Sequence, residues 1–380
     1  MNKVAVKPSV VRWARERSGK DMADLAKRFP KLPQWEGGEA QPTFKQLERF
    51  AKATLTPLGA LFLEEPPDEK LPVADFRTLK GQQPARPSAA LMTTVQQMQR
   101  RQEWMREYLI EAGEEPLAFV GTVTLASSRV DAANTIRRTL GVDNGWASTH
   151  STWSAALVGL RQAVEEIGVL VVVNGVVENN TRQKLDPEEF RGFVLCDDYA
   201  PLIFINGADF TSAQMFTLAH ELAHLWLGTD GVFNLVDLQP YDDDVERFCN
   251  EVAAEVLIPG DELDSCWPSV AQSAEPFHAL ARRFKVSPLV AARRVLDRKL
   301  IARDDFYGFL GRYAGDERRR SARQSSGGNF YNAQRGRVGR RFGSAVIRAA
   351  REGRLLYRDA YRLTGLHGRS FDQFAQTLGL

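Results

Sequence analysis

The residues with the clearest chemical potential form a His-Glu-x-x-His pattern at His220, Glu221 and His224. On a helix, residues four apart lie on one face, so both imidazoles can reach the same metal ion. Glu221 lies about 100° further around the helix, where it can act on a metal-bound water rather than on the metal. The chain has only five histidines, so this pattern arises by chance in on the order of half a per cent of such chains. It predicts a zinc hydrolase; the alternative is a pair of core histidines on a buried helix.

The helix that carries this pattern is predicted to be buried. Thr211 and Gln214 match a Thr-x-x-Gln capping box at its start, and Gly228 suits its C-terminal cap. Most residues between these limits are apolar: Met215, Phe216, Leu218, Ala219, Leu222, Leu225, Trp226 and Leu227. A buried His-Glu-His set is costly unless a metal ion or hydrogen bonds satisfy it. The burial therefore favours a metal site.

A catalytic zinc site needs a third protein ligand and one open position. None of the other three histidines stands at a suitable spacing, but a helix predicted over 245–259 offers carboxylates. Its apolar stripe is formed by Val245, Phe248, Cys249, Val252 and Val256. Glu251 points away from this stripe, whereas Glu246 and Glu255 lie on its two borders. Helical geometry leaves these last two as candidate ligands.

Composition limits the alternatives. The 380 residues predict two to four domains, and 43% hydrophobic with 26% charged residues is typical of globular proteins. The net charge of +2 is too small to indicate a nucleic-acid partner by itself. The three cysteines form no Cys-x-x-Cys pair, which argues against a disulfide framework or a cysteine zinc site. With no signal-peptide pattern and no membrane-length apolar run, we expect a cytoplasmic protein without a membrane partner.

The elements that would position the site are mostly helical. Buried strands are predicted at 168–174, 192–196 and 201–205, the last two joined as a hairpin through 197–200. Helices are predicted over 87–112, 131–140, 151–166, 338–352, 355–363 and 369–378. The expected fold class is α+β, mostly α.

The N-terminal segment is predicted to form helices from Ser9 as cap to about residue 18, over 21–28 and over 44–53. It resembles the helix-turn-helix region of Xre-type repressors, whose Trp-Glu-x-Gly-x-x-x-Pro-Thr stretch it matches at Trp35, Glu36, Gly38, Pro42 and Thr43. Two prolines, Pro30 and Pro33, interrupt the segment where a recognition helix would enter the major groove. Two interpretations stay open: DNA binding, or a degenerate module that binds protein or packs.

Residues 168–259 resemble the ImmA/IrrE family of metallopeptidases. The strand-hairpin approach, the Leu-Ala-His-Glu-Leu-Ala-His run and the second helix, Glu246 to Pro259, carry this resemblance. It implies a zincin-like core with a small sheet and two metal-bearing helices, and Glu246 as the third zinc ligand. It also implies a protein substrate, typically an Xre-type repressor cleaved in response to a signal such as stress.

The downstream segments are basic. Residues 277–301 predict two helices with Ser287 as a cap, resembling the helix-turn-helix segment of IrrE-like proteins. Their cations, which either contact phosphates or form a solvated face, are Arg282, Arg283, Arg293, Arg294, Arg298 and Lys299. From 312 to 341, nine arginines with Phe330 and Tyr331 predict a mobile basic loop. Such a loop is compatible with nucleic acid or an acidic protein partner; alternatively, its aromatic residues have a structural role.

Together these observations predict a zinc-dependent endopeptidase in which His220, His224 and Glu246 hold Zn²⁺ and Glu221 is the general base. Tyr241 and His278 are weak candidates for oxyanion stabilisation, and a substrate strand is expected along the edge of the 192–196 or 202–206 strand.

The alternative function is a DNA-binding regulator or antitoxin-like protein, with a partner from a neighbouring gene and a structural or vestigial metal site. The predicted domains are a helix-turn-helix domain at 1–66, a helical connector at 67–150, the peptidase core at 151–265, a second helix-turn-helix-like segment at 266–305, and a basic loop with a helical cap at 306–380.

Overall fold

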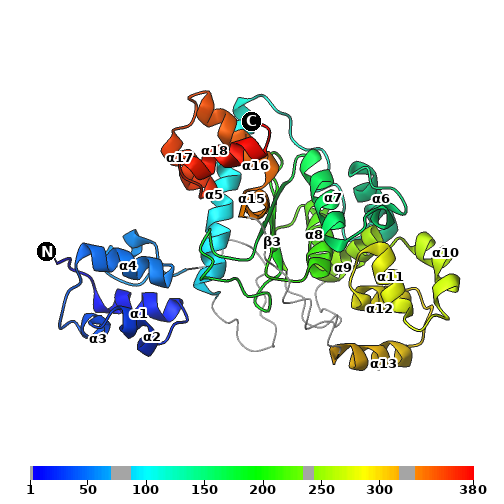
Figure 1. Cartoon of the computed structure of the whole chain (residues 1–380), viewed down its shortest axis with the longest axis horizontal. Helices are drawn as coiled ribbons and strands as arrows, with labels where there is room; N and C mark the ends of the chain where they lie inside the picture. Colours follow the sequence, from blue (N-terminus) through cyan, green and yellow to red (C-terminus); the bar gives the residue numbers. More distant parts are fainter. Residues whose placement is uncertain (1–2, 70–86, 234–243, 316–329) are drawn as a thin grey trace. The chain divides into compact units, whose positions relative to one another are not determined.

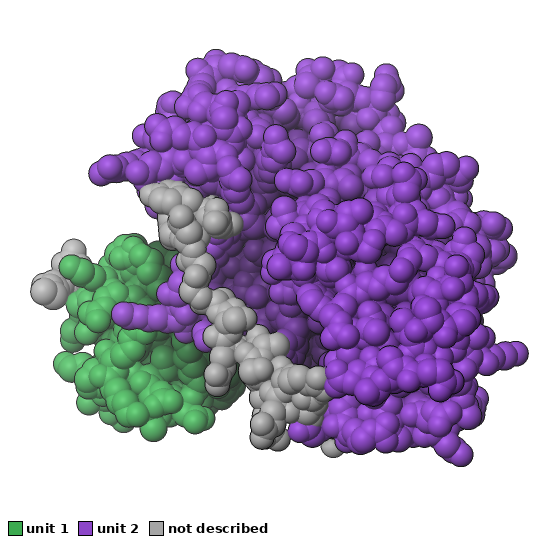
Figure 2. Space-filling view, turned by 45° about the vertical axis from the view of Figure 1, so that its right-hand side comes forward, with its two compact units in different colours: residues 1–72, 80–97 green, residues 73–79, 98–380 purple. Residues whose placement is uncertain are grey.

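The computed structural model describes residues 3–69, 87–233, 244–315 and 330–380 (Figure 1). The chain divides into two compact units, coloured separately in Figure 2. The first comprises 1–72 and 80–97, and the second comprises 73–79 and 98–380. In the described part, no helix is long and apolar enough to cross a membrane.

The first unit contains four short α-helices and one 3₁₀ helix around its own core. They are α1 (Pro8–Arg17), α2 (Met22–Arg28), α3 (Leu32–Glu36), α4 (Phe44–Thr54) and η1 (Leu58–Phe62). The rings of Phe29, Trp35 and Phe50 meet at centroid distances of 5.6–6.2 Å in the middle of this core. An ion pair between Arg15 and Glu36, 2.8 Å long, joins α1 to α3.

Caps decide where these helices begin. The predicted cap Ser9 was wrong: α1 begins at Pro8, a favourable first helical residue, with Lys7 at the N-cap. At α4, Thr43 and Gln46 form a full capping box. The helix α3, where a recognition helix would be expected, has only five residues and contains Pro33.

The second unit is built around a four-stranded sheet in the order β1-β3-β2-β4. The strands are β1 (Leu170–Asn174), β2 (Gly192–Leu195), β3 (Leu202–Asn206) and β4 (Gly231–Phe233). β2 and β3 form the predicted antiparallel hairpin, and β1 runs parallel to β3 with Val172 opposite Phe204. The strand β4, which the sequence analysis missed, pairs antiparallel with β2.

Helices cover one face of this sheet. Figure 1 shows α7 (Trp153–Glu166) and α8 (Thr211–Leu227) beside the strands. The helix α9 (Asp244–Leu257) packs on α8, and α6 (Arg129–Thr139) packs on α8 and α9. Alternate strand residues such as Val194 and Ile203 join the core with these helices. Phe193 and Phe204 point to the opposite face, where their rings stack at 4.9 Å.

The two edges of the sheet differ. Leu170 N–H donates to Pro201 O, directly before β3, so the carbonyls of the alternate residues Val171 and Val173 point outward. The helix α15 (Phe330–Val338) lies along this edge, where a Cβ at Gly336 would be 3.2 Å from Val173 O. The strand β4 forms the other edge among the described residues. Substrate pairing along an edge of 192–196 or 202–206 was therefore a wrong prediction, because β2 and β3 are both interior strands.

The start of α8 also differs from expectation. Its N-cap is Phe210 and Thr211 is already helical, so the predicted capping box was wrong. Instead, Gln214 Nε2 donates to Asp209 O over 2.7 Å. At the other end, Gly228 adopts the expected left-handed conformation with φ 70°. The segment before α6 covers this end, since Gly121 N–H and Val123 N–H donate to carbonyls of the last turn.

Further helices complete the second unit. They are η2 (Trp146–Thr149), α10 (Gly260–Val270), α11 (Pro276–Phe284), α12 (Pro288–Asp297), α13 (Arg303–Ala314), α16 (Arg340–Arg351), α17 (Tyr357–Thr364) and α18 (Arg369–Thr377). The predicted mobile loop at 312–341 was wrong at both ends, because α13 continues to Ala314 and α15 begins at Phe330. The residues between, 316–329, lie outside the described ranges. The predicted α+β, mostly α, fold class is confirmed.

The buried Arg101 lies on α5 (Ala89–Glu111) and hydrogen-bonds to two helices that are distant from it in sequence. Arg101 is 4% exposed, and it donates from Nε to Leu363 O at 2.9 Å and from Nη1 to Arg337 O at 2.7 Å. These carbonyls belong to the last turns of α17 and α15, which have no helical partners. Burial lowers the pKa of Arg101 to about 10, so the side chain stays charged at neutral pH.

Replacing Arg101 by methionine would leave both carbonyls without donors. We expect Arg101→Met to lower the free energy of unfolding by about 2–3 kcal/mol, measured by urea denaturation. The exposed neighbour Arg100 provides the control, and Arg100→Met should change stability by less than about 0.5 kcal/mol. Equal effects of the two variants would contradict the role given to Arg101.

Candidate metal centre

The helix α8 brings two imidazoles to one point. His220 and His224 are buried, and their Nε2 atoms lie 3.0 Å apart. The four-residue spacing places both rings on the same face of α8, as the sequence predicts. This face is covered by α9, which packs along α8.

The outer nitrogen of each ring has a polar neighbour. His220 Nδ1–H donates to Asn250 Oδ1 over 3.1 Å, because an amide oxygen can only accept. His224 Nδ1 lies 3.1 Å from Thr229 Oγ1. The Asn250 contact holds the His220 proton on Nδ1, and the Thr229 hydroxyl is able to accept from Nδ1–H of His224; in that arrangement both Nε2 lone pairs are directed at the shared point. Asn250 and Thr229 were not identified from the sequence, although Asn250 follows Glu246 by one helical turn.

The helix α9 adds a carboxylate to this point. Glu246 Oε2 lies 3.3 Å from His220 Nε2, and its Oε1 lies 3.3 Å from His224 Nε2. The other candidate from helical geometry, Glu255, instead pairs with Arg294 and accepts from Gly260 N–H at 2.9 Å.

The third carboxylate of α9 also lies away from the imidazoles. As predicted, Glu251 faces outward, where it pairs with Arg129 at 2.9 Å. Of the carboxylates on α9, only Glu246 is grouped with His220 and His224 among the described residues.

Glu221 lies beside this cluster without a hydrogen-bond partner. Both of its carboxylate oxygens are fully buried, and neither is hydrogen-bonded within the described structure. Its space is provided by Gly192 on β2, where a Cβ would lie 3.2 Å from Glu221 Oε1. The sequence analysis did not identify Gly192; its role depends on how closely β2 approaches α8.

The local electrostatics favour ligand forms of the cluster. Burial lowers the pKa of His220, against the opposing influence of Glu246, so its imidazole is neutral at neutral pH. Burial raises the pKa of Glu246, but its contacts with the two imidazoles outweigh burial and the net pKa lies below the usual value. Burial, and then the nearby Glu246, raise the pKa of Glu221. A buried carboxyl of raised pKa is suited to accept and release a proton.

The donor set fits a tetrahedral metal ion. Two imidazole nitrogens and one carboxylate oxygen lie within 4.8 Å of one another, with separations of 3.0–3.3 Å for the closest atoms. Ligands bound about 2.0–2.1 Å from a tetrahedral zinc ion are roughly 3.3–3.4 Å apart. Without a cation or proton between them, these lone pairs would repel. The residues therefore fit a metal, and nitrogen and oxygen donors of this kind suit zinc.

Other predicted residues lie elsewhere. The ring of His278 on α11 contacts Phe309 and Tyr313, and it is not part of the metal cluster. His150 packs against Trp146, and His367 packs against Tyr361. Tyr241 lies outside the described residues.

Comparisons with known proteins find two family models and one relative that match parts of this chain. The family described as IrrE N-terminal-like domain matches residues 164–296. The radiation response metalloprotease IrrE of Deinococcus deserti is 35% identical over 104 residues, which cover 26% of this chain and 36% of that relative. The chain therefore spans about a third of the length of this relative. A domain of unknown function matches residues 338–377.

The close approach of β2 to α8 can be tested at Gly192. An alanine Cβ there would lie 2.5 Å from Thr217 Cγ2 and 2.8 Å from Phe204 O, which is backbone. We expect Gly192→Ala to lower the free energy of unfolding by about 1–3 kcal/mol, measured by urea denaturation. Gly311→Ala is the control, since this α13 glycine has no atom within 4 Å of its Cβ position. The control should gain about 0.5–1 kcal/mol; a gain at Gly192 as well would refute the close approach.

Proposed function

We propose that this chain is a zinc-dependent endopeptidase of the ImmA/IrrE type, because residues 164–296 match the IrrE N-terminal-like domain and a metalloprotease, IrrE, is 35% identical over 104 residues. The observation that carries the proposal is the convergence of His220, His224 and Glu246 within 4.8 Å, beside the unpartnered carboxylate of Glu221. A core with two satisfied histidines would not need a carboxylate facing both Nε2 atoms.

In this proposal His220 Nε2, His224 Nε2 and one oxygen of Glu246 hold the ion. When bound, zinc would act as a Lewis acid and lower the pKa of water toward neutrality. Asn250 and Thr229 would hold the two rings in the orientation that directs Nε2 inward.

Glu221 is the proposed general base. Its carboxylate would accept a proton from the attacking water at Oε1 or Oε2, and then deliver that proton to the leaving amine nitrogen. Its burial excludes competing solvent, and its raised pKa makes the carboxylate a stronger base toward the attacking water. The close contact of β2 with α8 at Gly192 would keep the Glu221 carboxylate beside the three proposed metal ligands.

The proposed binding place for the substrate backbone is the edge strand β4. This strand pairs on one side with β2 and contacts α8, which carries the histidines. An extended peptide could add to its other side through main-chain hydrogen bonds. We further propose, from the family, that the substrate is a regulatory protein such as an Xre-type repressor.

A DNA-binding regulator has less support. The helix α3 has only five residues where a recognition helix would be needed. Four of the six cations of the α11–α12 region are paired with carboxylates, namely Arg283, Arg293, Arg294 and Arg298. Such pairing leaves less charge to contact phosphates. We therefore assign the first unit to protein recognition in this proposal.

Loss of the third ligand should weaken metal binding. We expect Glu246→Gln to reduce zinc affinity by more than about 100-fold, since losing only a supporting hydrogen bond costs 10–100-fold. The measurement is competition with a chromophoric chelator. Glu251→Gln, on the same helix but exposed and paired with Arg129, should bind zinc like the wild type. Unchanged affinity in Glu246→Gln would remove this residue from the site.

Loss of the base should separate catalysis from metal binding. We expect Glu221→Gln to reduce proteolysis by about 10²–10⁴-fold while its zinc content, measured by mass spectrometry, stays at the wild-type level. Proteolysis can be followed as new N-termini in cells that express either form. New N-termini within a helix-turn-helix repressor would support the proposed substrate. An equal set of cleavages in both forms would rule out the peptidase proposal.

A further inference from the structure

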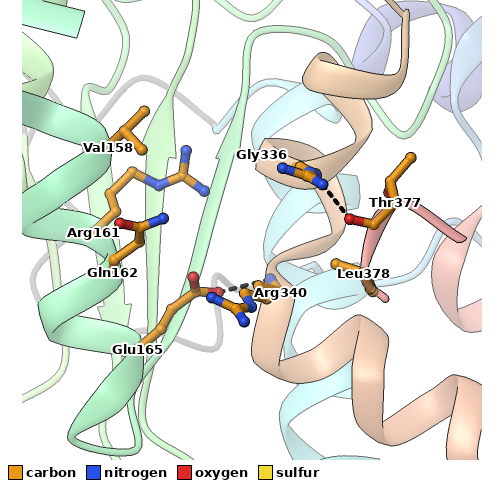
Figure 3. A pocket seen from close by; sticks show the side chains of 9 residues that line it. Val158, Arg161, Gln162, Glu165, Gly336, Arg340, Thr377 and Leu378 are labelled. Atoms are coloured by element: carbon orange, nitrogen blue, oxygen red, sulfur yellow. Dashed lines mark hydrogen bonds between the residues drawn. The ribbon is translucent and has the colours of Figure 1, made fainter. Parts of the chain in front are cut away.

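A second site of interest lies in the second unit, between α7 and the C-terminal helices. A cavity of about 480 Å³ is lined by residues of α7, α15, the start of α16 and the end of α18 (Figure 3). The α7 wall is formed by Val158, Arg161, Gln162 and Glu165, which share one helical face. The opposite wall includes Arg335, Gly336 and Arg340. None of these residues belongs to the candidate metal centre.

Arg161 is the unusual member of this lining. Its Nε is buried without a hydrogen-bond partner, and within the described structure its guanidinium has no ion-pair partner. Figure 3 shows its side chain extending from α7 toward Gly336, where a Cβ would lie 3.7 Å from Arg161 Nη1. The glycine allows α15 to approach β1 closely and brings its backbone near this partly desolvated cation. Glu165 influences Arg161 electrostatically, but no ion pair joins the two side chains, and a bound anion would offset the remaining cost of desolvation.

The one carboxylate in the cavity is already engaged. Glu165 Oε1 accepts from Arg340 N–H at 2.7 Å and from Arg341 N–H at 3.3 Å, so it caps the N-terminus of α16. Gly339, the N-cap of α16, has φ 82°, which favours glycine. Glu165 therefore serves the helix and does not pair with Arg161.

The charges of the lining are unbalanced. Arg161, Arg335 and Arg340 come from three elements, and Glu165 is the only acidic residue among the lining residues. Arg335 donates to Thr377 O, which is neutral, so its charge is also uncompensated. Three cations against one anion leave two positive charges. A phosphomonoester carries about this charge at neutral pH, and guanidinium groups bind its oxygens in pairs.

We propose that this cavity binds a small phosphorylated organic ligand, whose phosphate contacts Arg161 and Arg340. The volume is within the usual range for small-molecule sites. Of the lining residues, Glu165 lies in the region that matches the IrrE-like family, and Arg340 lies in the matched domain of unknown function, so the cavity has walls from both regions. The proposal is independent of the peptidase function, and its test requires neither metal nor proteolysis.

The experiment uses the full chain and glycerol 2-phosphate as the probe, followed by ³¹P line broadening at constant ionic strength. We expect saturable broadening with the wild type and at least a tenfold loss of affinity in Arg161→Met. Arg348→Met is the matched control, an exposed arginine on α16 that does not line the cavity, and it should bind as the wild type does. Absence of broadening, or equal broadening in both variants, would overturn the proposal.

Two further measurements keep the result interpretable. The melting temperature of ligand-free Arg161→Met should equal or exceed that of the wild type, because an unpartnered buried cation is removed. A large decrease would instead indicate a structural role and contradict the proposal. If this variant does not fold, the exposed Arg340 provides a second one, and Arg340→Met should show the same tenfold loss.

Glutarate, a dianion with separated charges, should compete at least tenfold less well than the phosphate; equal competition would overturn the assignment to a phosphate.

Discussion

The repulsion between three electron-rich groups at one point is the constraint on which the second unit depends. Two imidazole nitrogens lie 3.0 Å apart, and a carboxylate lies 3.3 Å from each of them. All three are held by helices that are packed along each other, so they cannot easily separate. Positive charge at the point where they meet would therefore stabilise this arrangement.

The surrounding elements serve this arrangement in different ways. The helix α8 supplies the spacing, α9 supplies the carboxylate, and the contacts of Asn250 and Thr229 fix the orientation of the rings. The sheet contributes through close approach: Gly192 allows β2 to reach the helix without displacing Glu221. Positioning thus comes from backbone packing as much as from the reactive side chains, as a preorganised site requires.

Local sequence patterns predicted the elements, and they failed where distant segments decide the structure. The His-Glu-x-x-His spacing, the hairpin and Ser287 as a cap follow from residues close in sequence. The choice between Glu246 and Glu255 needed more than helical angles, because Arg294 engages Glu255 from a helix nearly forty residues later in the chain. Gly192 and β4 depend on tertiary contacts with no local pattern. The same reason explains α15, whose helix is formed against the edge of β1 from a segment rich in arginine and glycine.

The helix α15 limits how the sheet can pair with other chains, because it covers the edge of β1. The outward carbonyls of β1 face Gly336 and Gly339. A Cβ added at Gly336 would lie 3.2 Å from Val173 O, and one added at Gly339 would lie 3.0 Å from Val171 O. No strand from another molecule can add there without expelling α15. Among the described elements, only β4 leaves an edge through which the sheet can be extended, and α15 protects the protein from pairing edge to edge with its own copies through β1. A sheet with one closed side also gives any added strand a single, defined position relative to α8.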